Sequence, residues 1–207
     1  AVFSATALIF AWIENWSILA LMVVAYIAGI IYNIPLLPNK ARWRRLKDIP
    51  ASKDLFTAMA WGMVVGGAPI LASSHRINPL AAIGAMAFIF LLAFGKTVAF
   101  DLRDIAGDRL IGSETIPALF GRKSAIKALF AVKALALGLT LAFSFSGFFA
   151  PLGYAMAVLP LYGLGYLAYF RKGFPPEETK CQIIVDGQFL LAGFLAAGSG
   201  MFFRVDF

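Results

Sequence analysis

The chain has 207 residues, of which 61% are hydrophobic and only 14% charged, and its formal net charge is +7. This composition lies outside that of water-soluble domains and predicts a membrane protein. With a single cysteine, Cys181, and a single histidine, His75, the sequence excludes an internal disulfide and argues against a cysteine-based or histidine-based metal site and a Ser-His-Asp triad.

Apolar stretches in the sequence predict transmembrane helices over residues 17–33, 55–73, 79–100, 124–146, 150–170 and 183–203. Each is close to the ~20 residues that a bilayer-spanning helix needs. A seventh apolar segment, residues 1–13, is too short to span, and the chain begins without Met or a basic signal-peptide start. We interpret it as the second half of a helix. The expected fold is an all-α transmembrane bundle, a single domain over residues 1–207 that lacks its first helices.

Basic residues predict how the helices are oriented. Lys and Arg are concentrated in the connecting stretches 34–54, 101–123 and 171–182, whereas the intervening loops hold only Arg76. By the positive-inside rule, these three stretches face the cytoplasm, with the inner (plasma) membrane as the expected location. No basic, aromatic-interleaved groove is visible, so the positive charge indicates anionic membrane lipids rather than nucleic acid as partners.

Three aspartates, Asp101, Asp104 and Asp108, follow the apolar stretch 79–100 with the spacing i, i+3, i+7. If the helix continues past the membrane, at ~100° per residue the three side chains fall within about a 60° sector of one face. Such a cluster repels itself, and Mg²⁺, which binds one or two carboxylates together with substrate phosphates, offsets that repulsion. The spacing predicts a metal–diphosphate site at the membrane surface.

The stretch 34–54 contrasts with this acidic cluster. It contains Pro35, Pro38 and Pro50, which break any continuous helix, and six cations. Lys and Arg side chains suit phosphate oxygens that the metal leaves exposed. Asp48 and Asp54 flank this basic run, and we do not expect them to complete the acidic site.

The motifs on these two stretches resemble those of a known family. The run from Asp101 to Asp108, continued by Gly112, Thr115, Pro117 and Gly121, resembles the second aspartate-rich motif of the UbiA superfamily of intramembrane aromatic prenyltransferases. The segment 32–62, with Tyr32, Pro35, Lys40 and Trp61-Gly62, is similar to the loop between the fourth and fifth helices of that family. The resemblance extends over nearly the whole chain and is most specific over residues 100–121.

The resemblance implies a nine-helix bundle around a central cavity, of which this chain would hold six complete spans and a partial first helix. At the cytoplasmic end, Mg²⁺ held by two aspartate-rich motifs would bind an isoprenyl diphosphate. Ionisation of that donor would give an allylic cation that alkylates an aromatic or other lipophilic, lipid-quinone-type acceptor. The implied site residues are Asp101, Asp104 and Asp108 as catalytic metal ligands, Lys96 and Arg103 as nearby cations, and Tyr32 and Lys40 in the second part of the cap.

The chain departs from the family pattern in one respect. The first motif, of the form N-D-x-x-D-x-x-x-D, is absent, since no Asn-Asp pair occurs in the sequence. We therefore expect the chain to be an inactive fragment of a longer enzyme, with a catalytically inactive family member as the alternative. For Lys96, snorkelling to the interface is an equally valid interpretation.

Other functions remain open at this point. A cation or small-molecule transporter could place carboxylates at a membrane mouth, although transporters generally bury ionisable groups near the midplane. A structural membrane protein would need no carboxylate cluster. The aspartates could also form a solvated helix extension with Arg103 and Arg109 as partners.

Overall fold

The structure is a computed structural model that describes residues 2–36, 38, 44–73, 77–110, 115–149, 151–173 and 178–202. Apart from an isolated bridge between Pro35 and Arg45, the regular structure of these residues is helical. The elements are α1 (Val2–Glu14), α2 (Trp16–Asn33), η1 (Leu46–Asp48), α3 (Ser52–Trp61), η2 (Gly62–Gly67), α4 (Ala68–Ala72), α5 (Pro79–Asp101), α6 (Ile105–Leu110), α7 (Ile116–Phe145), α8 (Leu152–Met156), α9 (Val158–Lys172) and α10 (Glu178–Phe202).

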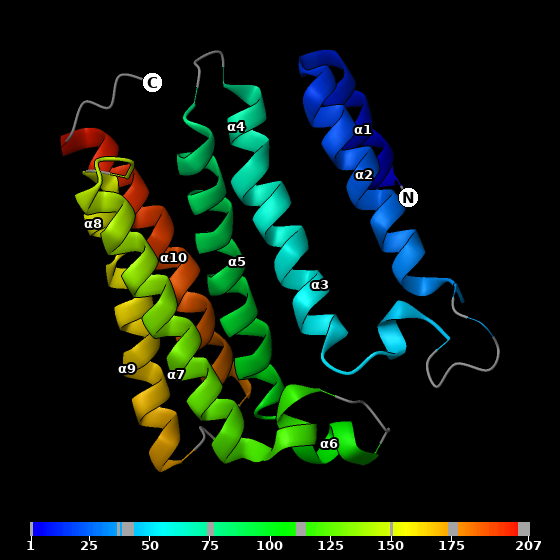
Figure 1. Cartoon of the computed structure of the whole chain (residues 1–207), viewed down its shortest axis with the longest axis vertical. Coiled ribbons are helices and arrows are strands. Elements are labelled where there is room, and N and C mark those ends of the chain that lie inside the picture. Colours follow the sequence, from blue (N-terminus) through cyan, green and yellow to red (C-terminus); the bar gives the residue numbers. More distant parts are fainter. Residues whose placement is uncertain are drawn as a thin grey trace.

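Six described helical segments are long and apolar enough to cross a membrane, which confirms the predicted all-α membrane fold. They are Trp16–Asn33, Ser52–Ala72, Pro79–Asp101, Ile116–Phe145, Leu152–Lys172 and Thr179–Gly198. The second of these joins α3, η2 and α4, and the fifth joins α8 and α9. Figure 1 shows the long helices side by side, with α5 between α3 and α7.

Helix α7 begins eight residues before the apolar stretch 124–146 that predicted it. Pro117 lies in its first turn, where a missing N–H is tolerated, and the helix path is broken at Gly121 (φ 78°). A positive φ is accessible to glycine without steric cost. The short segment before Gly121 therefore runs along the end of the bundle before the membrane-spanning part begins.

The core lies between α5, α7, α9 and α10, where Val98, Leu129, Leu167 and Val185 are buried in one cluster. On the other side of α5, glycines permit close helix contact. A Cβ at Gly66 would lie 3.0 Å from Met86 Cα, so the backbones of η2 and α5 approach each other closely at this point. Small residues have this role in membrane bundles because they let helices approach closely.

The end of the bundle drawn at the bottom of Figure 1 holds the described parts of the predicted basic stretches. The segment after α2 with η1, the helix α6, the start of α7 and the end of α9 all lie there. This agrees with the alternation predicted from Lys and Arg. Among the described residues, the end that carries Asp101, the last residue of α5, is therefore also the more basic end.

Candidate functional site

The predicted continuous helix through the three aspartates is wrong. Helix α5 ends at Asp101, residues 102 and 103 form a turn, and α6 begins only at Ile105. Asp104 directly precedes α6, a position where aspartate is favoured because its carboxylate can accept from the first turn. In agreement, a Cβ at Gly107 would lie 3.5 Å from Asp104 Oδ1. Asp101, Asp104 and Asp108 consequently do not share one helix face.

Asp101 is buried and forms an ion pair with a residue from the start of α3. Lys53 Nζ donates to Asp101 Oδ1 at 2.7 Å, and the exposed fractions of the two side chains are 57% and 7%. The second oxygen, Asp101 Oδ2, is buried and has no hydrogen-bond partner among the described residues. Lys53 thus reaches from the surface to bond one carboxylate oxygen of Asp101, Oδ1, and does not occupy the other, Oδ2.

Asp54 lies next to Lys53 in α3 and is completely buried. It lies close enough to Asp101 and Lys53 to interact electrostatically, and Thr97 of α5 is beside it. None of these neighbours has hydrogen-bond geometry to either of its carboxylate oxygens. The expectation that Asp54 stays outside the acidic site is therefore wrong, because the antiparallel contact of α3 with α5 places it beside Asp101.

Three buried carboxylate oxygens, Asp54 Oδ1 and Oδ2 and Asp101 Oδ2, lack a partner within the described part of the chain. A buried charge without a partner is strongly unfavourable, so this donor set fits a cation. Mg²⁺ binds through one or two carboxylates and takes its remaining ligands from water and phosphates. No group of three or more Asp, Glu, His or Cys side chains that could hold a metal ion occurs among the described residues. The pair would therefore hold only part of the coordination shell.

The other two predicted aspartates differ in their surroundings. Asp108 is half-buried, accepts from Thr115 Oγ1 at 2.8 Å, and interacts electrostatically with Asp101 and Lys53. Asp104 is exposed. The structure thus brings Asp108 to the rim of the Asp54 and Asp101 pair and leaves Asp104 on the surface of the same end.

The predicted auxiliary residues lie on both sides of this pair. The Tyr32 hydroxyl is 3.3 Å from Ser52 Oγ, one residue from Lys53, so the end of α2 contacts the start of α3. Lys96 Nζ lies 2.6 Å from Asp186 Oδ1 and 5.1 Å from the ring centroid of Phe189, both on α10. Arg103 lies near Cys181, also on α10. Lys40 falls outside the described residues.

Lys96 therefore has an acidic partner inside the bundle. Its ion pair with Asp186 ties α5 to α10 and does not point to the Asp101 carboxylate. This contact between helices gives Lys96 a structural partner, and its expected role as a cation near the diphosphate stays a prediction.

An apolar groove of about 310 Å³ lies between the same two spans that carry Asp54 and Asp101. It is lined by Met59, Gly62, Met63, Ile83, Met86, Ala87 and Phe90. Met59 is five residues after Asp54, and Phe90 is eleven residues before Asp101, so at ~1.5 Å per residue the groove lies roughly 8–16 Å from the carboxylates along the helices. The two carboxylates and the apolar groove thus follow one another along α3 and α5.

Comparisons with known proteins give the family and the fold of the chain. The model of the UbiA prenyltransferase family matches residues 1–192. Digeranylgeranylglyceryl phosphate synthase from Thermococcus kodakarensis is 32% identical over 196 residues, which represent 91% of this chain and 63% of that protein. This chain therefore spans less than two thirds of that relative's length.

Two solved structures of a UbiA homolog from Archaeoglobus fulgidus have the same fold at 21% identity and cover 95% of this chain. The one bound to Cd²⁺ has a TM-score of 0.67 with 68% of its chain covered. The one bound to GPP and Mg²⁺ has a TM-score of 0.68 with 65% covered.

Proposed function

The chain belongs to the UbiA prenyltransferase family, and on this basis we propose that it takes part in the transfer of an isoprenyl group from an isoprenyl diphosphate to a lipophilic acceptor within the membrane. The family membership also confirms the resemblance drawn from the motifs around Asp101. The single observation that carries the proposal is the buried pair of Asp54 and Asp101, whose three unpartnered carboxylate oxygens lie at the basic end of a transmembrane bundle.

We assign the diphosphate end of the donor to this pair. Asp54 and Asp101 would hold Mg²⁺, with Asp108 at the rim and Asp104 on the surface as further ligands of the metal–diphosphate complex. When bound, Mg²⁺ supplies charge neutralisation for the departing diphosphate. The A. fulgidus homolog with GPP and Mg²⁺ supports a divalent cation as the cofactor.

Lys53 is the cation best placed to bind phosphate oxygens. Its side chain is more exposed than that of its partner Asp101, so its ammonium group can move from the carboxylate toward a ligand at the surface. A positive group held where negative charge develops lowers the barrier to loss of the leaving group. Tyr32 and Lys40 are assigned to the cytoplasmic cap of the site, on the same side as Lys53. Arg103 is assigned to the opposite side of that cap.

The isoprenyl tail would lie in the apolar groove between α3, η2 and α5. Met59, Met63 and Met86 are flexible side chains that adapt to an irregular hydrocarbon chain. Phe90 also lines the groove, and its π face can stabilise a nearby cation. An apolar wall excludes water, which would otherwise trap the allylic cation.

The acceptor is proposed from the named relative and from the family resemblance. The T. kodakarensis relative is named for a glyceryl phosphate lipid, which makes a prenylated glyceryl phosphate the first acceptor to test. An aromatic, quinone-type acceptor is the second. We further propose that the site faces the cytoplasm, because the basic stretches lie at its end of the bundle.

The experiment is an assay of diphosphate release from geranyl, farnesyl and geranylgeranyl diphosphates, with each acceptor, in Mg²⁺ and in EDTA. In a longer protein that also carries the first aspartate-rich motif, we expect release that depends on both Mg²⁺ and an acceptor. Equal activity in EDTA would contradict the assignment of the carboxylate pair. That the 207 residues are inactive by themselves stays a prediction, which the same assay on this chain tests.

A further inference from the structure

A second polar site lies between α7 and α9, at the same end of the bundle but on other elements than the carboxylate pair. It is a cavity of about 690 Å³ lined by Arg122, Lys123, Ile126, Lys127, Phe130 and Arg171. We call it the basic groove. Four of its six lining residues are cations and none is acidic. None of the six belongs to the site around Asp101, so the proposed prenyl transfer leaves this groove unexplained.

Local backbone geometry builds the basic groove. The break at Gly121 (φ 78°) ends the first segment of α7, so Arg122 begins the part of the helix that runs beside α9. Arg122 Nη2 donates to the carbonyl oxygen of Phe170 on α9 at 3.0 Å, which fixes this guanidinium between the two helices. Arg171 lies in the last turn of α9. Cations from two helices therefore line one groove.

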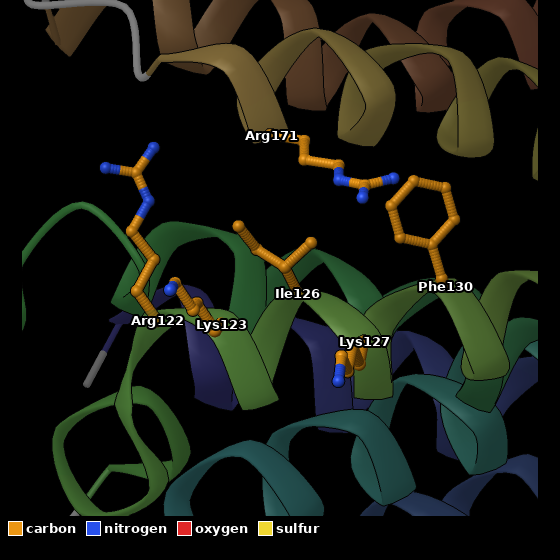
Figure 2. Close-up of a pocket in the computed structure, with 6 residues that line it drawn as sticks. All are labelled: Arg122, Lys123, Ile126, Lys127, Phe130 and Arg171. Carbon is orange, nitrogen blue, oxygen red and sulfur yellow. The ribbon is translucent and has the colours of Figure 1, made fainter.

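The groove changes character with depth. Figure 2 shows Arg122, Ile126 and Phe130 pointing from α7 toward α9, and Arg171 extending from α9 toward the ring of Phe130. Ile126 and Phe130 follow Arg122 at intervals of four residues, so they line the wall one and two turns deeper along the helix. The groove thus has Arg122 and Lys123 at its mouth and an apolar wall that Lys127 and Arg171 flank.

This combination selects the chemistry of a ligand. Four like charges along one groove repel each other, and an anion between them offsets that repulsion. Guanidinium groups bind phosphate oxygens in a bidentate manner, and an ammonium group adds a point charge. A free phosphate would use the mouth but not the apolar wall. An amphiphile with a phosphate at the membrane boundary and a hydrocarbon chain below it uses both.

We propose that the basic groove binds an anionic phospholipid of the surrounding bilayer. Its phosphate lies between Arg122, Lys127 and Arg171, and the first part of an acyl chain lies along Ile126 and Phe130. Basic pockets between transmembrane helices at the cytoplasmic side recognise anionic headgroups in this way. The bound lipid would bridge α7 and α9, whose contact Arg122 already supports.

The test is native mass spectrometry and thermal unfolding of the full chain in detergent with added phosphatidylglycerol, phosphatidylcholine or inorganic phosphate. The test variant is Lys127→Gln with Arg171→Gln, which leaves the Arg122 contact to α9 intact. The matched control is Lys172→Gln with Lys180→Gln, which removes two exposed cations from the same end of the molecule without touching the groove lining.

The wild-type chain should retain phosphatidylglycerol but not phosphatidylcholine, and phosphatidylglycerol should raise its unfolding temperature. The test variant should bind this lipid roughly tenfold more weakly, because each cation near an anionic headgroup strengthens attraction, and the control should bind like the wild type. An equal loss of phosphatidylglycerol binding in the control variant would mean that general surface charge explains the effect. That result would overturn the proposal. Equal stabilisation by inorganic phosphate, or equal retention of phosphatidylcholine, would also overturn it. If the double variant does not fold by circular dichroism, Lys127→Gln alone is measured against Lys172→Gln under the same criteria.

Discussion

Lys53 Nζ lies 2.7 Å from Asp101 Oδ1 and so joins the first turn of α3 to the last residue of α5. The contact fixes the two ends that carry the buried carboxylates. Since Asp54 follows Lys53 directly, the same contact holds Asp54 beside Asp101. One exposed lysine thus positions the site and remains close enough to its opening to bind a ligand.

Replacement of this lysine tests its proposed role in donor binding. For Lys53→Met we expect KM for the isoprenyl diphosphate to rise about tenfold or more, because a hydrogen bond to a charged group contributes ~1.5–3 kcal/mol. Lys53→Arg keeps the charge and should change KM much less. Steady-state kinetics with varied donor measure both, and equal KM values for wild type and Lys53→Met would exclude the role.

A second prediction concerns the interior of the bundle. Lys133 of α7 is completely buried, and its Nζ donates to Gln188 Oε1 of α10 at 2.8 Å. A charge inside the membrane is costly without a partner. Gln188→Leu should therefore lower the unfolding free energy by roughly 2–3 kcal/mol, whereas Gln188→Glu, which keeps an acceptor, should lower it less. Thermal unfolding in detergent compares them, and an unchanged midpoint in Gln188→Leu would refute this account of the lysine.

The apolar groove predicts selectivity for the length of the donor. Ala87 lines it, and Ala87→Phe should fill part of its volume. Transfer from geranylgeranyl diphosphate should then fall more than transfer from the shorter geranyl diphosphate. Ala85→Phe is the matched control on the same helix, because Ala85 lines a separate pocket with Phe88 and Phe148. A parallel loss with both donors, or the same change in the control, would place the tail elsewhere.

Cysteines introduced one at a time can report the orientation of the protein in the membrane. Ala106 in α6 and Lys172 at the end of α9 are exposed at the basic end, and Ile77 is exposed just before α5 at the other end. The native Cys181 is buried and provides a low background. In intact cells, an impermeant thiol reagent should label Ile77→Cys and spare Ala106→Cys and Lys172→Cys. The opposite pattern would reverse the proposed topology.

The spans and their common basic end could be predicted from the sequence because both depend on local composition. About twenty apolar residues suffice for a spanning helix, and clusters of Lys and Arg mark the connections on one side. The six predicted stretches correspond to the six observed spans. The early start of α7 could not be predicted from the apolar stretch 124–146, because Pro117 and Gly121 precede that stretch.

The site itself could be predicted only in part. Asp101 was identified by its spacing to Asp104 and Asp108, but that spacing is the same whether the helix continues or breaks after Asp101. The position of Asp54 beside Asp101 could not be predicted, because it depends on the antiparallel contact between α3 and α5 and not on neighbours in sequence. One local signal was present, since a Lys–Asp pair begins an apolar span at the end where the aspartate cluster was expected.

The most direct test of the proposed site is the rate of Mg²⁺-dependent diphosphate release from geranylgeranyl diphosphate in single Asp→Asn variants. We expect release by Asp54→Asn and Asp101→Asn to be slower by about 10²–10³-fold, since each removes charge stabilisation of the order of 2–4 kcal/mol. Asp104→Asn and Asp108→Asn should also be slower at limiting Mg²⁺. Asp48→Asn is the control, because Asp48 is exposed and accepts from the Arg45 backbone N–H. Wild-type rates in both Asp54→Asn and Asp101→Asn, in an otherwise active and folded protein, would contradict the account.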